Sequence, residues 1–197
     1  MIDHYRTLAV TAESRQKIER SEFLGIAFPV ETDEAFFSEL ALLTKRHFDA
    51  THLCWAFRLF ASGEIRARSA DAGEPSGTAG KPILSALEGA GLYDVAVVVV
   101  RWYGGVKLGT GGLSRAYRET AAETLRGASL LDRYLYQRFR IIVPFDQLGV
   151  VYRLLDVPHI VLAGEHFGET NEFEIDVRLG RADEFVKMLA EKRITLL

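Results

Sequence analysis

A run of six apolar residues, Val95 to Val100, is the feature that most limits how this chain can fold. Five of the six are β-branched valines, and no polar residue alternates with them. A strand with water on one face would alternate, so this one is expected to be buried on both faces. The run is also far shorter than the roughly 20 residues that span a bilayer. The sequence therefore predicts the central strand of a sheet that is covered on both sides, and no membrane segment.

The residues before this run predict three further strands for such a sheet. Apolar residues predict strands at 23–30 and 52–60. One face of the second strand carries Leu53, Trp55, Phe57 and Leu59. A turn at residues 62–63, Ser-Gly, predicts a hairpin whose next strand continues this inward face with Ile65 and Ala67.

Helical spacing of apolar residues predicts three helices in the same part of the chain. The first follows Thr32, which can cap it, and the second has Pro82 in its first turn. The third begins near Leu113 and has one apolar face, whereas its other face carries charged residues that include Arg115 and Arg118. Strands and helices are thus mixed in the first part, which predicts an α/β arrangement.

The pattern changes after Leu130 and is complete in itself. The predicted strands cover residues 135–143, 160–163, 173–179 and 194–197, and the predicted helices cover 146–155 and 182–189. The resulting order, βαββαβ, is that of a ferredoxin-like domain. The sequence therefore predicts an α+β protein of two domains, residues 1–131 and 132–197.

Charge and composition exclude several classes of protein. The 197 residues contain 24 Lys and Arg against 27 Asp and Glu, a net charge of −3, and 48% of them are hydrophobic. This hydrophobic content excludes a chain that is disordered throughout. The net charge excludes a strongly basic nucleic-acid binder, so any nucleic acid must be held by a local patch.

The single cysteine, Cys54, cannot form an intramolecular disulfide, and no group of Cys and His residues has the spacing of a zinc site. Proline occupies two key positions of a P-loop around Lys81, and Ser114 replaces the third glycine of the dinucleotide fingerprint. We therefore expect neither a metal nor a cofactor. The first ten residues do not form a signal peptide, so we expect a cytoplasmic protein.

Glycine is concentrated in the middle of the chain, where eleven of the 17 glycines lie between residues 63 and 112. The densest stretch directly precedes the third helix and contains Gly104, Gly105, Gly109, Gly111 and Gly112. A glycine-rich turn at a helix N-terminus can present backbone N–H groups to an anion. Arg101, Lys107 and Arg115 would add positive charge around it. The alternative is that the glycines only form turns and allow close packing.

Four other side chains are candidates for a secondary, chemically active site. His52 and Cys54 share a face of one strand and could form a nucleophile pair. Asp71 and Glu74 could act as acid and base. The simpler interpretations are a buried thiol beside a histidine at the strand edge, and a loop in which a carboxylate caps backbone N–H groups.

Alternation along the predicted hairpin suggests a basic strip on an open face of the first domain. The strip comprises His52, Arg58, Arg66 and Arg68. In the second domain the solvent face of one strand carries Glu172, Glu174 and Asp176, which would repel phosphates. That face also lacks the stacking aromatic residues of an RNA-binding sheet. If RNA is bound, we expect the first domain to do most of the binding.

Three segments of the chain resemble the signature of the IMPACT/YigZ family. They are Glu74-Pro-Ser-Gly-Thr-Ala-Gly80, the glycine-rich segment from Arg101 to Leu113, and His52-x-Cys54. The resemblance covers about residues 15–126, and the second half is similar to the smaller C-terminal domain of bacterial members.

The resemblance implies a first domain like domain IV of elongation factor G, a ribosomal-protein-type α/β fold, and a second like its domain V. Those elongation-factor domains function in contact with the ribosome and tRNA. Eukaryotic relatives regulate translation through a kinase pathway, largely by means of an extra N-terminal RWD domain, which we do not expect here because the resemblance begins near residue 15. Kinase regulation is therefore not carried over, and the resemblance supplies no catalytic residues.

These observations together favour a non-enzymatic, cytoplasmic protein that associates with RNA or the ribosome, with a protein partner in translation control as a further expectation. The hypothesis predicts a convergent basic surface without a deep pocket. One alternative is a hydrolase of a small anionic or peptide substrate, which predicts that His52, Cys54, Asp71 and Glu74 converge in a cleft. Another is a protein-interaction module with an exposed apolar patch. The sequence leaves the oligomeric state open.

Overall fold

The computed structural model describes residues 3–61 and 64–197. It divides into two compact units, a first unit of Tyr5–Asp132 and a second unit of Arg133–Leu197 together with Asp3 and His4. Strands β1 (His4–Leu8) and β7 (Leu130–Tyr134) pair in a two-stranded sheet. The predicted turn at residues 62–63 lies outside the described residues. None of the helices described is both long and apolar enough to cross a membrane.

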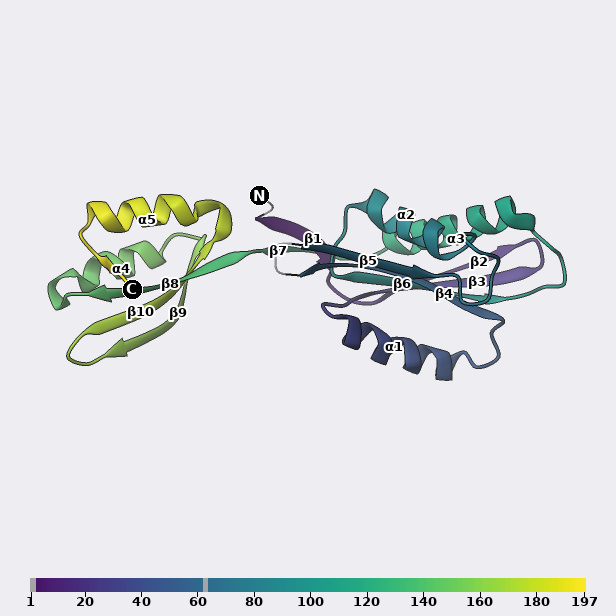
Figure 1. Cartoon of the computed structure of the whole chain (residues 1–197), viewed down its shortest axis with the longest axis horizontal. Helices are drawn as coiled ribbons and strands as arrows, with labels where there is room; N and C mark the ends of the chain where they lie inside the picture. The colour runs from purple at the N-terminus through teal and green to yellow at the C-terminus, as the bar shows by residue number, and fades with distance from the viewer. Residues whose placement is uncertain (1–2, 62–63) are drawn as a thin grey trace. The chain divides into compact units, whose positions relative to one another are not determined.

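The first unit is built around a five-stranded antiparallel sheet in the order β2-β3-β6-β4-β5 (Figure 1). The strands are β2 (Ala12–Ile18), β3 (Ser21–Pro29), β4 (His52–Ala61), β5 (Glu64–Ala70) and β6 (Val95–Trp102). Helix α1 (Asp33–Arg46) covers one face, and helices α2 (Gly80–Ala90) and α3 (Gly109–Arg126) cover the other. The predicted central strand is confirmed, because β6 lies in the middle and Val95 to Val100 are fully buried.

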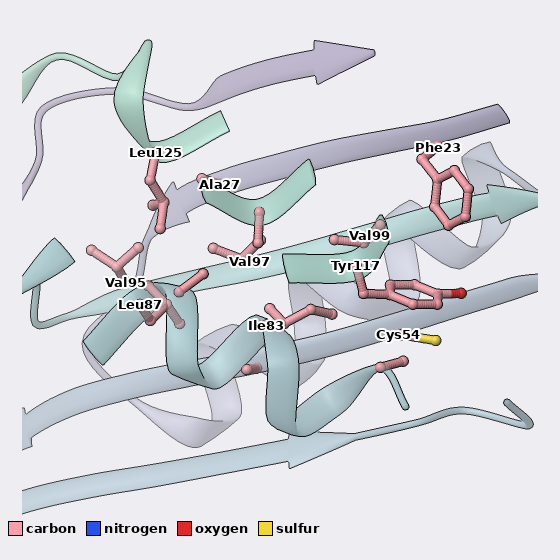
Figure 2. Close-up of a cluster of buried hydrophobic side chains, with 14 of the residues drawn as sticks. Phe23, Ala27, Cys54, Ile83, Leu87, Val95, Val97, Val99, Tyr117 and Leu125 are labelled. Carbon is pink, nitrogen blue, oxygen red and sulfur yellow. The ribbon is translucent and has the colours of Figure 1, made fainter. Parts of the chain in front are cut away.

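Successive residues of β6 supply two separate cores, because neighbouring side chains of a strand point to opposite faces. Val98 packs on the α1 side with Phe36 and Phe57. Val97 and Val99 pack on the α2 and α3 side, where Figure 2 shows them among the buried side chains. Thr32 caps α1 as predicted, since its hydroxyl accepts a hydrogen bond from the Ala35 N–H at 3.1 Å. Because β6 is buried on both faces of the sheet, the valine run does not alternate with polar residues.

The predicted inward face of β5 is wrong. Ile65 is 48% exposed, and Ala67 is exposed as well. The hairpin register pairs Ala61 with Glu64, so each pair joins an odd-numbered residue to an even-numbered one. Directly opposed residues share a face of the sheet. The even-numbered residues of β5 therefore lie on the face of Phe57 and Leu59, and the odd-numbered ones on the other.

The second unit is the predicted βαββαβ domain, and its sheet order β11-β8-β10-β9 is ferredoxin-like. Its elements are β8 (Tyr136–Val143), α4 (Leu148–Leu155), β9 (Ile160–Phe167), β10 (Asn171–Arg178), α5 (Ala182–Glu191) and β11 (Thr195–Leu196). One face of the sheet and the two helices form a core around Ile141, Phe173 and Phe185. The fold is thus a mixture of helices and antiparallel sheets.

The other face of this sheet is not the acidic surface that the sequence predicted. The register places Arg140 opposite Glu174 and Arg138 opposite Asp176. Both pairs form ion pairs, at 2.7 Å and 2.8 Å. Two of the three carboxylates are therefore neutralised by a neighbouring strand, and repulsion of phosphates is much weaker than expected.

Candidate functional site

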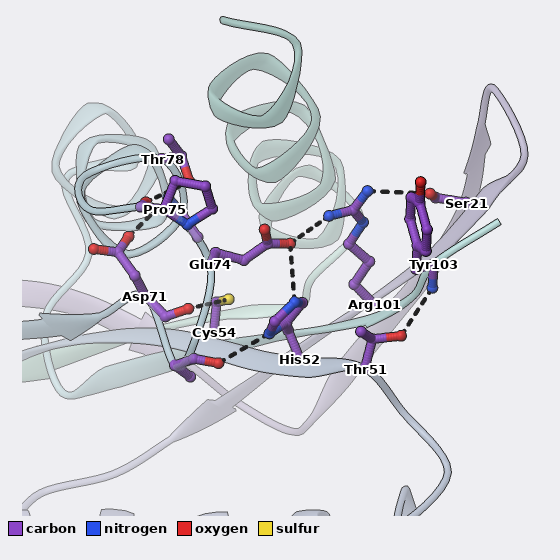
Figure 3. A network of polar contacts seen from close by, with 12 residues as sticks. Ser21, Thr51, His52, Cys54, Asp71, Glu74, Pro75, Thr78, Arg101 and Tyr103 are labelled. Carbon is purple, nitrogen blue, oxygen red and sulfur yellow. Dashed lines mark hydrogen bonds and ion pairs between the residues drawn. The ribbon is translucent and has the colours of Figure 1, made fainter. Parts of the chain in front are cut away.

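Three segments that are far apart in the sequence meet at one end of the first unit (Figure 3). They are the start of β4, the loop that follows β5, and the glycine-rich loop between β6 and α3. The register of the sheet brings the first and third together, because His52 lies opposite Arg101. Two hydrogen bonds of Thr51 reinforce this junction, from its N–H to the Arg101 carbonyl and from the Tyr103 N–H to its hydroxyl.

A buried ion pair forms the centre of this end. Arg101 donates from Nη1 to Glu74 Oε1 at 2.5 Å, and the two side chains are 6% and 3% exposed. Tyr117 donates its hydroxyl to the same oxygen at 2.8 Å. Burial and the neighbouring Cys54 and Glu74 raise the pKa of Tyr117, so its hydroxyl remains protonated and donating. Removing two charges from water is costly, and such a pair persists only when each charge has its partner.

The guanidinium of Arg101 has one further partner and one unfilled position. Nη2 donates to Ser21 Oγ at 3.2 Å. Nε is buried and has no acceptor within the described part of the chain. A buried donor without an acceptor is destabilising.

His52 is held in one tautomer beside this pair. Its Nδ1 lies 3.1 Å from the Ala72 carbonyl oxygen, which can only accept a hydrogen bond. Nδ1 therefore carries the proton, and Nε2 lies 4.0 Å from Glu74 Oε1. The structure thus brings together two of the four predicted secondary-site residues, His52 and Glu74.

Cys54 points into the core rather than into a cleft. It is completely buried, and its thiol donates to the Asp71 carbonyl oxygen at 2.9 Å. Burial raises its pKa from the ordinary 9.0 to about 12. The reactive form of cysteine is the thiolate, so this side chain is inert at neutral pH. Its burial and its hydrogen bond favour the buried-thiol interpretation over the nucleophile interpretation.

Asp71 is a capping residue for α2. Its Oδ1 accepts hydrogen bonds from the N–H groups of Ala79 and Gly80, and its Oδ2 accepts one from Gly77. Burial opposes the charged form, but these hydrogen bonds and the charge of Lys81 outweigh burial and lower the pKa of Asp71. The capping interpretation of this loop is confirmed. Across the described ranges, no group of three or more His, Cys, Asp or Glu residues is arranged to hold a metal ion.

The buried thiol leads to a prediction about pH. Well below pH 9 neither state of the protein ionises Cys54, and its contribution to stability is fully present. Between pH 9 and pH 12 the unfolded chain loses this proton and the folded chain keeps it, so stability falls as pH rises. The stability difference between wild type and Cys54→Ala, measured by guanidinium unfolding, should shrink by roughly 1 kcal/mol from pH 8 to pH 10.

Alkylation supplies the control for this prediction. Iodoacetamide should leave Cys54 unmodified in the folded protein at pH 8 and modify it after unfolding. Rapid alkylation of the folded protein would contradict the assignment.

A pocket of about 410 Å³, the α3 pocket, opens beside the ion pair. It is lined by Thr51, His52, Glu74, Pro75, Arg101, Tyr103, Lys107, Leu108, Gly109, Thr110 and Leu113. Ligand sites in proteins are typically mostly apolar pockets of 300–1,000 Å³ with a few convergent polar groups. The RNA-binding hypothesis predicts a surface without a deep pocket, whereas the folded chain brings three distant segments together around this space.

The backbone conformation of the glycine-rich loop requires glycine at two positions, Gly104 and Gly109. A Cβ at Gly104 would lie 1.7 Å from the carbonyl oxygen of Arg20, so the backbones approach too closely for a side chain. Gly109 opens α3 with a φ of +69°, which favours glycine. The residue before it, Leu108, makes no side-chain capping bond, so the first N–H groups of this 18-residue helix lack a side-chain cap. The remaining predicted positions, Gly105, Gly111 and Gly112, belong to the same loop and first turn.

Of the three cations predicted around this loop, Arg101 and Lys107 line the α3 pocket, whereas Arg115 does not. Arg101 is buried, while Lys107 is exposed at the α3 pocket. Arg115 lies in a second depression of about 600 Å³ between the two helices, the α2–α3 groove. The groove is lined by Gly77, Lys81, Pro82, Ser85, Ser114, Arg115, Arg118, Glu119 and Ala122. The site prediction omitted Lys81 and Arg118, although the spacing of Arg115 and Arg118 on one helix indicated a shared surface.

The predicted basic strip does not exist, because its members lie on opposite faces of the sheet. Arg66 and Arg68 share the α1 face and form ion pairs with Asp33 at 2.9 Å and 3.0 Å. Arg58 lies on the other face, 4.0 Å from the centre of the Tyr93 ring. That face is covered by α2 and α3 rather than open. The odd-to-even register of the hairpin is the physical reason for this separation.

Comparison with known proteins gives a consistent result. Residues 19–125 match the model of the Impact N-terminal domain. A Bacillus subtilis (strain 168) protein, IMPACT family member YvyE, is 32% identical over 97% of this chain and 88% of its own length. A Thermus thermophilus IMPACT family member is 46% identical over 73% of this chain and 76% of its own. A solved structure of a hypothetical protein superposes with a TM-score of 0.70 and 27% identity, covering 100% of this chain and 98% of that one.

Proposed function

The chain belongs to the IMPACT family, and from this membership we propose that it is a cytoplasmic, non-enzymatic protein that binds RNA or the ribosome and modulates translation. The translational part of the proposal is supported by the family, whose eukaryotic members regulate translation. The RNA-binding part is supported by the surface of the first unit.

The observation that carries the proposal is a set of unpaired cations along the α2–α3 groove. Lys81, Arg115 and Arg118 are exposed and form no ion pair within 4.0 Å among the described residues, although Glu119 lines the same groove and Lys81 lies close enough to Asp71 to lower its pKa. Lys107 adds a fourth such cation in the loop before α3. Cations without protein partners can each neutralise a phosphate and release its counterions. Because the whole chain carries a charge of −3, this local patch supplies the attraction.

The alternative of a hydrolase is less well supported by the same geometry. Cys54 and Asp71 already have structural roles, as a buried donor and as a helix cap. His52 and Glu74 remain, but Glu74 Oε1 is occupied by Arg101 and Tyr117. These contacts favour binding over catalysis.

Co-sedimentation of the wild-type protein with purified ribosomes tests the proposal. We expect the protein to pellet with ribosomes at roughly 50 mM salt and to be largely released at roughly 200 mM, because binding through several phosphates weakens steeply with salt. Single-stranded RNA, titrated under the same conditions, should show the same dependence. Absence of binding to both ribosomes and RNA at the low salt concentration would overturn the proposal.

A further inference from the structure

The α3 pocket differs in composition from the α2–α3 groove, and phosphate binding in the groove gives no reason for that composition. Its walls are largely apolar, with Pro75, Leu108 and Leu113. The buried carboxylate of Glu74 and the buried guanidinium of Arg101 line the same space. A buried ion pair is weak evidence for stability. Its position at a pocket, with His52 beside it, indicates a ligand that needs both hydrogen-bond donors and acceptors.

One side of the α3 pocket can hold a phosphate. The uncapped N-terminus of α3 contributes Gly109 and Thr110, and Lys107 is exposed beside them. Arg101 is 5% exposed, and its Nε is a buried donor with no acceptor in the described ranges. The helix dipole and the lysine charge both favour an anion. Since Glu74 compensates Arg101, Lys107 is the uncompensated charge of the pocket.

The other side can hold a planar ring. Tyr103 is 44% exposed, and the guanidinium carbon of Arg101 lies 5.4 Å from the centre of its ring. Aromatic rings and arginine planes are the surfaces on which unstacked bases pack. Glu74 and His52 line the same pocket on the other side of Arg101 from this ring (Figure 3), and they offer polar atoms to the edge of a base. An isolated phosphate would leave these groups and the apolar walls without contacts.

From this arrangement we infer that the α3 pocket binds a single nucleotide, with the phosphate at Lys107 and the start of α3 and the base against Tyr103. A volume of about 410 Å³ holds one nucleotide but not a duplex. The nucleotide is either free or an end or unpaired position of an RNA strand. The second source rests on the proposed function, whereas the pocket itself does not.

Calorimetric titration in phosphate-free buffer tests the inference, with the four nucleoside 5′-monophosphates, inorganic phosphate and adenosine as probes. We expect the monophosphates to bind more tightly than either phosphate or adenosine. Tyr103→Ala should weaken monophosphate binding roughly tenfold or more, the contribution of one stacked base, and Tyr103→Trp should retain it. Lys107→Ala should weaken it as well. Arg66→Ala removes an exposed cation that is paired with Asp33 on the α1 face of the sheet, and as the matched control it should leave binding unchanged.

The results separate this inference from the proposed function. RNA binding without monophosphate binding would overturn the inferred nucleotide site in the α3 pocket and leave the proposed RNA-binding groove standing. Monophosphate binding without RNA binding would support the pocket and overturn the proposed function. Equal binding of phosphate and monophosphates, or no effect of folded Tyr103→Ala, would overturn the inferred base contact. Tighter binding of a 5′-phosphorylated oligonucleotide than of monophosphates would support RNA as the source, and equal binding would support a free nucleotide.

Discussion

Replacing Arg101 by methionine should lower the free energy of unfolding by roughly 3–5 kcal/mol, because the buried Glu74 carboxylate is left without its cation. The ion pair is 2.5 Å long between side chains that are at most 6% exposed, so water cannot replace the lost partner without opening the site. Methionine fills a similar space, which limits the cavity left behind. Guanidinium unfolding of wild type and variant at pH 7 measures the loss.

The double variant Arg101→Met, Glu74→Gln is the matched control. It removes both charges, and the glutamine oxygen can still accept from Tyr117. Replacing both partners of a buried pair costs much less than removing one, so the double variant should be more stable than Arg101→Met alone. Equal losses of unfolding free energy in the single and double variants would show that the stability cost of the buried Glu74 charge does not depend on Arg101.

Removing Lys107 and Arg115 together should weaken binding to RNA or ribosomes by roughly 100-fold at low salt, about tenfold for each lost phosphate contact. Both side chains are exposed, so their replacement by alanine should leave the fold intact. Each loss should also make the salt dependence shallower, by roughly 0.7–0.9 in the slope of log K against log salt. The measurement is binding against salt for Lys107→Ala, Arg115→Ala and the double variant, with folding checked by circular dichroism.

Arg66→Ala, Arg68→Ala provides the control with the same change in charge. These two arginines are already paired with Asp33 on the opposite face of the sheet. We expect the control to lose little affinity, so specific phosphate contacts can be distinguished from a general change in net charge. If the Lys107, Arg115 double variant binds no more weakly than this control, the proposed anion-binding surface is wrong.

Local sequence patterns determined the elements of this protein. The valine run could only be a strand covered on both faces, because β-branched side chains without alternation need apolar neighbours on each side. In the second unit, the alternation of the strands and the helical spacing of α4 and α5 together predicted the ferredoxin-like order. The helix start at Thr32 was equally local, since the cap and the N–H that it accepts are three residues apart.

The tertiary structure alone decided which charged side chains are available to a ligand. Arg101 and Glu74 are 27 residues apart, and Arg68 and Asp33 are 35 apart, yet both pairs meet as ion pairs. The hairpin register likewise sent Arg58 to one face and Arg66 to the other. Whether a cation is free depends on which carboxylate lies within a few ångströms in space, and the spacing of residues along the chain carries no information about that distance. The α3 pocket has the same origin, because three separate segments must fold together before its phosphate and base sides face each other.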